Sequence, residues 1–167
     1  MDLTPGTDRQ DALVGWGFVA VQFALLLVIV LAPTGTAWSV PEGVARAARL
    51  LQWVGMVVLG VGLVSLGRSL TAHPAPLDRG TLRTGGAYRL VRHPIYAGIL
   101  ALAYGTAVVG GSWAIVAAAL GLTGWFAAKA RWEEARLRVA YPGYDDYAAR
   151  TPRFVPLWPW GADRHRA

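Results

Sequence analysis

The chain of 167 residues contains no cysteine. It therefore forms no disulfide, has no thiolate metal site or cysteine nucleophile, and cannot be prenylated or palmitoylated. Histidine is also scarce, with three residues in the whole chain. We expect no metal site, because so few histidines offer little for a metal to bind.

Charged side chains are scarce as well. Asp, Glu, Lys and Arg make up 16% of the residues, compared with about 25% in an average soluble domain. They are absent from three stretches, 12–41, 50–67 and 93–128. Uncharged apolar stretches of about 18 residues or more are typical of membrane-spanning helices. We therefore expect an all-α integral membrane protein with a single domain over 1–167, in which 1–65 form anchoring helices and 66–160 carry the site.

The apolar stretches predict about four membrane-spanning helices, followed by a C-terminal cytoplasmic helix and tail. The stretch 93–128 is too long for one crossing at 1.5 Å per residue, and Gly110-Gly111-Ser112 near its middle predicts a turn. The helices are expected at about 12–32, from between 44 and 50 to 67, at 94–109 and at 113–128. No break signal follows 128, so the last helix is expected to continue into the cytoplasm.

Side chains within the apolar stretches indicate how these helices meet. Ala97, Ala101 and Gly105 recur every four residues, a spacing that allows helices to approach closely in lipid. Gln22 and Gln52 are expected to hydrogen-bond between helices.

The basic residues fall mostly on one side of the membrane. Fourteen lie in the N-terminal segment, the 68–92 loop and the segment after 128, whereas Arg46 and Arg49 lie on the other side. By the positive-inside rule both termini are cytoplasmic, and we expect the plasma membrane of a prokaryote. The net charge of +6 comes from these loop arginines, so no nucleic-acid partner is expected.

The first segment with catalytic potential runs from Arg92 to Gly98. Pro94 suits the first position of a helix, which places Arg92 and His93 just before a helix N-terminus. Unpaired backbone N–H groups and the helix dipole favour a carboxylate or phosphate there. The alternative is a snorkelling arginine beside a capping histidine.

The second segment holds the adjacent residues Glu133 and Glu134 on the continued fourth helix. One interpretation pairs Lys129 with Glu133 and Glu134 with Arg138, each at i,i+4 spacing. The other directs one glutamate at ribose hydroxyls or at a cation. Spacing alone leaves both open.

Taken in order, the two segments resemble a known family. An Arg-His-Pro-x-Tyr-x-Gly element at 92–98, followed about 35 residues later by Glu133-Glu134, is similar to the isoprenylcysteine carboxyl methyltransferase and phospholipid N-methyltransferase group of integral membrane methyltransferases. The tail Tyr-Pro-Gly-Tyr-Asp-Asp-Tyr at 141–147 and Arg-Phe-Val-Pro at 153–156 looks like the family's closing pattern. The resemblance covers about 66–156, and Ala87 departs from the proline that family members commonly have there.

The resemblance implies S-adenosyl-L-methionine as the cofactor. The implied cofactor-binding residues are Tyr88, Arg92, His93, Pro94, Tyr96, Gly98, Glu133 and Glu134. The implied catalytic residues are Arg92, Glu133 and Arg153, and the implied substrate-binding residues are Tyr144, Tyr147 and Arg153. Gly98 would let the ligand approach closely.

The implied reaction is methyl transfer to a lipophilic acceptor at the cytoplasmic face, most like that of an isoprenylcysteine carboxyl O-methyltransferase. A phosphatidylethanolamine N-methyltransferase is the alternative within the group. From other classes, an NADPH-dependent sterol-type membrane reductase and an inactive scaffold protein remain. Ile95 argues against the reductase, because those enzymes usually have Asn after the Arg-His-Pro element.

Overall fold

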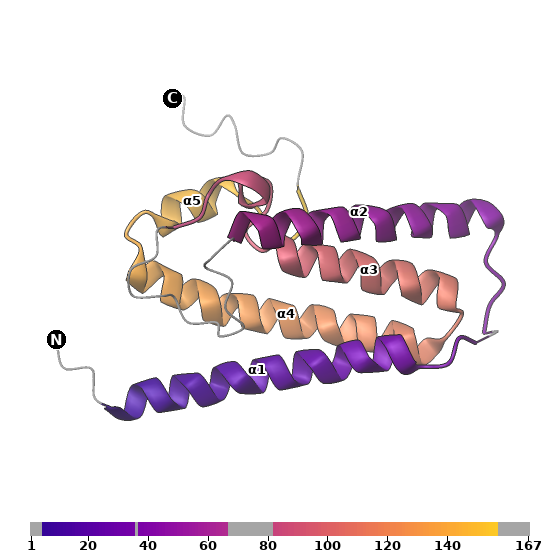
Figure 1. Ribbon diagram of the computed structural model, residues 1–167, viewed down its shortest axis with the longest axis horizontal. Helices are drawn as coiled ribbons and strands as arrows, with labels where there is room; N and C mark the ends of the chain where they lie inside the picture. Colours follow the sequence, from indigo (N-terminus) through magenta and orange to yellow (C-terminus); the bar gives the residue numbers. More distant parts are fainter. Residues whose placement is uncertain (1–4, 36, 67–81, 157–167) are drawn as a thin grey trace.

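The computed structural model describes residues 5–35, 37–66 and 82–156, and this part of the chain is all-helical, as expected (Figure 1). The elements are α1 (Pro5–Leu31), α2 (Glu42–Leu66), the short 3₁₀ turn η2 (Gly86–Arg89), α3 (Pro94–Gly110), α4 (Trp113–Ala140) and α5 (Tyr144–Arg150). The predicted all-helical architecture is confirmed, and four long helices follow one another in the expected order; the short α5 was not predicted from the sequence.

α1 and α2 begin earlier than expected, α1 at Pro5 rather than at about 12. α2 begins at Glu42 rather than between 44 and 50. Glu42 in the first turn suits the positive end of the helix dipole, and its Oε1 accepts a hydrogen bond from Arg46 Nη2 at 2.7 Å, one turn along. α4 continues without interruption to Ala140, which agrees with the predicted extension beyond 128.

The four long helices run alternately in opposite directions (Figure 1). The connection between α1 and α2 lies against the turn between α3 and α4: the Gly35 N–H donates to the Gly110 carbonyl at 2.8 Å, and the Ala37 N–H to the Gly111 carbonyl at 3.1 Å. Gly111 has φ of 56°, a left-handed conformation that glycine adopts without strain. We call this end of the molecule the turn end, and the opposite end, with η2 and α5, the site end.

The helices form a row in the order α2, α3, α4, α1, with α1 and α2 at its edges (Figure 1). The buried core lies between α1, α3 and α4. It includes Leu100, Ile115, Ala119, Leu122 and Phe126. Large apolar side chains on the outer faces of α1 and α2 remain exposed, as lipid-facing side chains would be.

α2 and α3 approach so closely that their backbones touch. A Cβ atom on Gly98 would lie 2.7 Å from the Gly55 carbonyl oxygen, and one on Gly105 would lie 2.8 Å from the Ala48 carbonyl oxygen. Gln52 Nε2 donates to Thr106 Oγ1 at 3.0 Å across the same contact. The predicted close approach and the interhelical hydrogen bond of Gln52 are both confirmed.

The chain is a membrane protein. Within the described residues, three helices are long and apolar enough to cross a bilayer: Leu13–Leu31 of α1, and the whole of α2 and α4. α3 is a shorter apolar helix of 17 residues, about 25 Å long, and it carries the chain from the site end back to the turn end. The N-terminal part of the 68–92 loop and the last residues of the tail lie outside the described residues.

Candidate functional site

The two predicted motifs meet at the site end. Because α3 and α4 run antiparallel from the turn at Gly111, the start of α3 lies beside the distant part of α4. His93 Nε2 lies 3.1 Å from Glu134 Oε1, and the Tyr96 hydroxyl donates to Glu133 Oε1 at 2.6 Å. We call Arg92, His93, Tyr96, Glu133, Glu134 and Arg153 the Arg–Glu cluster.

Glu134 is the buried centre of this cluster, with its side chain 1% exposed. Its Oε1 and Oε2 accept hydrogen bonds from Arg153 Nε and Nη2 at 2.9 and 2.7 Å. Arg92 Nη2 lies 3.3 Å from Oε1. A buried carboxylate needs such pairing and bidentate hydrogen bonding to offset its lost hydration. In return, the hydrogen bonds to Glu134 raise the pKa of the Arg153 guanidinium.

The predicted i,i+4 pair between Glu134 and Arg138 does not form. Glu134 points into the cluster, whereas Arg138 Nε donates to Asp145 Oδ1 at 2.8 Å on the exposed side. The interpretation that pairs Glu134 with Arg138 was wrong, because Glu134 lies on the packed face of α4.

Glu133 is held less tightly than Glu134. Apart from the hydroxyl of Tyr96, its neighbours include His93, whose Nδ1 lies 3.6 Å from Glu133 Oε2. The Glu133 side chain is 15% exposed, and its Oε2 has the more distant partner. Of the two glutamates, Glu133 therefore has an oxygen that a ligand can reach.

Lys129 belongs to the site, although the sequence pattern predicted only a pair with Glu133. Its side chain is buried, its Nζ donates to Gln22 Oε1 of α1 at 3.0 Å, and it lies 5.2 Å from the centre of the Tyr96 ring. Its position directly after the uncharged stretch 93–128 was the one available signal, since an ionisable residue at a membrane-spanning helix often marks a functional site. The hydrogen bond also confirms the interhelical role expected for Gln22.

Aromatic rings fix the orientation of Tyr96. The His93 and Tyr96 rings are stacked with centroids 5.3 Å apart, and Tyr96 stacks on Phe126 at 4.4 Å. Phe154 lies beside His93 at 5.9 Å. The sequence analysis did not single out Phe126 or Phe154, because apolar aromatic residues carry no local sign of which ring they contact.

The segment after α5 folds back over the start of α3. The Arg92 and His93 N–H groups donate to the Pro152 and Arg153 carbonyls at 2.8 and 3.0 Å. Arg92 Nη1 donates to the Ala148 carbonyl at 3.0 Å. This backbone pairing brings Arg153 next to Glu134, although the two residues are 19 positions apart in sequence.

The predicted substrate-binding residues Tyr144 and Tyr147 lie in α5, directly before this folded-back segment. Both are buried, and the Tyr147 hydroxyl donates to the Tyr88 carbonyl at 2.6 Å. Burial, together with the nearby Glu133 charge, raises the pKa of Tyr88 to about 12. Burial and the nearby Glu134 charge raise the pKa of Tyr144 to about 12.

Pro94 occupies the first position of α3, as expected, and is buried. Gly98 faces α2, so in this structure it allows the approach of α2 rather than of a ligand. Within the described residues, no group of three or more His, Asp or Glu side chains is placed to hold a metal ion.

The sequence profile of the phospholipid methyltransferase family matches residues 46–143. The chain belongs to this family. The match includes most of α2, all of α3 and α4, and both motifs of the Arg–Glu cluster, whereas α1 and Arg153 lie outside it. The predicted resemblance to the isoprenylcysteine carboxyl and phospholipid methyltransferase group is confirmed.

Curated relatives cover a similar part of the chain. The cobalt-zinc-cadmium resistance protein CzcN of Cupriavidus metallidurans is 38% identical over 109 residues, which are 64% of this chain and 50% of that protein. Probable protein-S-isoprenylcysteine O-methyltransferases of Oryza sativa subsp. indica and subsp. japonica are each 35% identical over 109 residues, 62% of this chain and 56% of those proteins. The chain thus spans about half the length of the curated relatives it matches. No solved structure matches it.

Proposed function

We propose that this protein transfers a methyl group from S-adenosylmethionine to a lipophilic acceptor, most like an isoprenylcysteine carboxyl O-methyltransferase. The observation that carries the proposal is the meeting of the two motifs in one cluster, with Glu134 between Arg92 and Arg153 and Glu133 beside them. Membership of a methyltransferase family supports it.

The chemistry of the cluster fits the amino-acid part of this cofactor. Arg92 Nε is buried and has no hydrogen-bond partner among the described residues, so it offers a donor to a carboxylate. Glu133 offers an acceptor to an ammonium group or to ribose hydroxyls. The cofactor, when bound, supplies a methyl group on a sulfonium sulfur, and transfer breaks the carbon–sulfur bond as the acceptor forms its bond to that carbon.

The residues of the chain act mainly by binding and orienting. Glu134 fixes the positions of Arg92 and Arg153. Tyr96 holds Glu133, so that the two arginines and Glu133 keep one geometry relative to each other. Such positioning supplies most of the rate in a bimolecular transfer. A carboxylate acceptor is already ionised at neutral pH and needs only orientation, for which the open side of Arg153 is available. An amine acceptor would need a base, and Glu133 is the group placed for it.

The distribution of basic residues supports a cytoplasmic position for the site end. Arg83, Arg89 and the basic residues of distal α4 lie toward it, whereas Arg46 and Arg49 lie toward the turn end. From the positive-inside rule we infer that the cluster lies on the cytoplasmic side, as we expect for both termini. A lipophilic acceptor would reach the cluster from the bilayer, and the cofactor from the cytosol.

Titration calorimetry of the detergent-solubilised protein with S-adenosylmethionine and with NADPH tests the proposal. Only the former should bind, and Glu133→Gln should weaken its binding roughly tenfold to 150-fold, because a hydrogen bond to a charged group contributes about 1.5–3 kcal/mol. Asp145→Asn, at an exposed pair on α5, is the matched control and should bind as the unaltered protein does.

Assays with labelled methyl donor then compare a prenylcysteine with phosphatidylethanolamine as acceptor. Methylation of the prenylcysteine carboxylate is the expected outcome. Binding of NADPH alone would favour the membrane reductase, and binding of neither ligand would favour a scaffold.

A further inference from the structure

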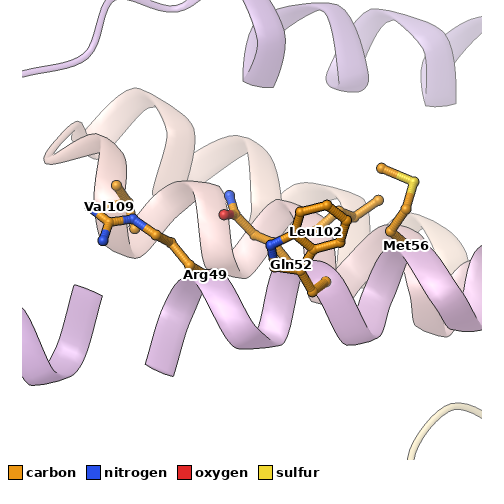
Figure 2. A pocket seen from close by; sticks show the side chains of 6 residues that line it. Arg49, Gln52, Met56, Leu102 and Val109 are labelled. Atoms are coloured by element: carbon orange, nitrogen blue, oxygen red, sulfur yellow. The ribbon is translucent and has the colours of Figure 1, made fainter. Parts of the chain in front are cut away.

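We propose that a groove between α2 and α3, remote from the Arg–Glu cluster, binds one membrane phospholipid with its phosphate at Arg49. The groove has a volume of about 430 Å³ and is lined by Arg49, Gln52, Trp53, Met56, Leu102 and Val109. Figure 2 shows Arg49, Gln52 and Met56 of α2 close to Leu102 and Val109 of the neighbouring α3. The inference does not depend on the proposed methyl transfer.

The Arg49 end of the groove lies at the depth of the lipid headgroups. Trp38 Nε1 donates to the Val108 carbonyl at 3.1 Å, and the next residue, Val109, lines the groove beside Arg49. The Trp38 and Trp113 rings meet edge to face with centroids 5.0 Å apart. Tryptophan is enriched at the membrane–water interface, so this pair marks the headgroup layer at the turn end.

Charge distinguishes Arg49 from the other arginine of this end. Arg46 is paired with Glu42 at 2.7 Å. Arg49 has no acidic partner in the part of the chain that the structure describes. A guanidinium at headgroup depth matches a phosphate group, which it binds with two parallel hydrogen bonds.

The groove becomes apolar away from Arg49. Trp53, Met56 and Leu102 line its inner part, and Met56 lies two helical turns, or about 10 Å, from Arg49 along α2. Trp53 and Met56 are 71% and 52% exposed. This change from cation to apolar surface follows the direction from headgroup to bilayer centre, which is the polarity of a phospholipid.

A second copy of the chain fits the groove less well. A symmetric contact places the same surface of both copies together, and through this groove it would bring two unpaired Arg49 side chains toward each other. A phosphate instead neutralises the charge. The occupant is therefore a phospholipid of the leaflet at the turn end.

Native mass spectrometry of the protein in mild detergent tests this inference, with phosphatidylglycerol added and with diacylglycerol, which lacks the phosphate, as the matched ligand. We expect one phosphatidylglycerol per chain and at least about tenfold weaker retention of diacylglycerol. Arg49→Gln should lose phosphatidylglycerol to the same extent. Arg46→Gln, three residues away and engaged by Glu42, should retain it.

Leu102→Trp provides a second variant that keeps Arg49 and fills the apolar part of the groove. It should also lose the lipid, so the test stands even if Arg49→Gln fails to fold. Retention of phosphatidylglycerol by Leu102→Trp, or by folded Arg49→Gln, would overturn the inference. So would a lipid-free dimer that Arg49→Gln dissociates, because the occupant would then be a second copy.

Discussion

Replacing Glu134 with glutamine is expected to destabilise the protein by about 3 kcal/mol. Glutamine keeps the shape of the side chain and one acceptor oxygen, but it leaves Arg92 and Arg153 facing each other without the carboxylate between them. Breaking a buried ion pair on one side costs about 3–5 kcal/mol. The low end applies here because the Arg92 and Arg153 side chains are 12% and 30% exposed, which allows water to screen part of the repulsion.

The assay is reversible unfolding in mixed micelles, followed by circular dichroism. A loss of about 3 kcal/mol corresponds to a roughly 150-fold larger unfolding equilibrium constant. Asp145→Asn is the matched control, since it breaks the pair between Arg138 and Asp145, whose side chains are 45% and 75% exposed, respectively. Exposed pairs of this kind contribute about 0–1 kcal/mol. If Glu134→Gln cost no more than Asp145→Asn, the reasoning would be refuted.

A double variant separates charge from packing. Glu134→Gln combined with Arg153→Gln removes one of the two unpaired cations, so its destabilisation should be clearly smaller than the sum of the two single effects. Additive effects would mean that Glu134 and Arg153 do not act as a pair.

Three further outcomes are expected in the same unfolding assay. Gln22→Leu should cost about 1–3 kcal/mol, because it removes the acceptor of the buried Lys129 ammonium, and Lys129→Met in that background should restore part of the loss. Gly98→Ala should cost several kcal/mol by pushing on the α2 backbone, whereas Gly60→Ala, with nothing within 4 Å of the new Cβ, should be neutral or slightly stabilising. Burial raises the pKa of Tyr88 from 10.0 to about 12. The stabilisation by its neutral hydroxyl should therefore be complete below pH 10 and be lost as the pH rises toward 12. Tyr88→Phe should remove this part of the alkaline loss of stability, and a pH profile unchanged by the substitution would contradict the prediction.

The helices and the meeting of the two motifs could be predicted because both depend on short-range rules. Uncharged stretches give helix positions, and the Gly110-Gly111-Ser112 turn makes α3 and α4 antiparallel. Once that hairpin forms, His93 has to lie near Glu133 and Glu134. No further information is needed to bring the motifs together.

The partners of Glu134 could not be predicted in the same way. The i,i+4 rule indicated Arg138, but that rule describes helix surfaces in water, and the sequence does not say which face of α4 is covered. Arg153 reaches Glu134 only because the backbone of 152–153 pairs with Arg92 and His93. That contact joins segments far apart in sequence, and no local sequence pattern predicts it.

α1 also contributes a contact to the site that no local sequence pattern predicts. It lies outside the family match, yet Gln22 holds Lys129 next to the Arg–Glu cluster. Gln22 is neutral, so it satisfies a hydrogen bond of the ammonium without compensating its charge. Arg92, Lys129 and Arg153 thus bring three basic side chains to two acidic ones, Glu133 and Glu134, in a partly buried region. Unpaired charge is costly in such a region, and in the proposed reaction the carboxylate of the cofactor or of the acceptor is the anion that these basic side chains would bind.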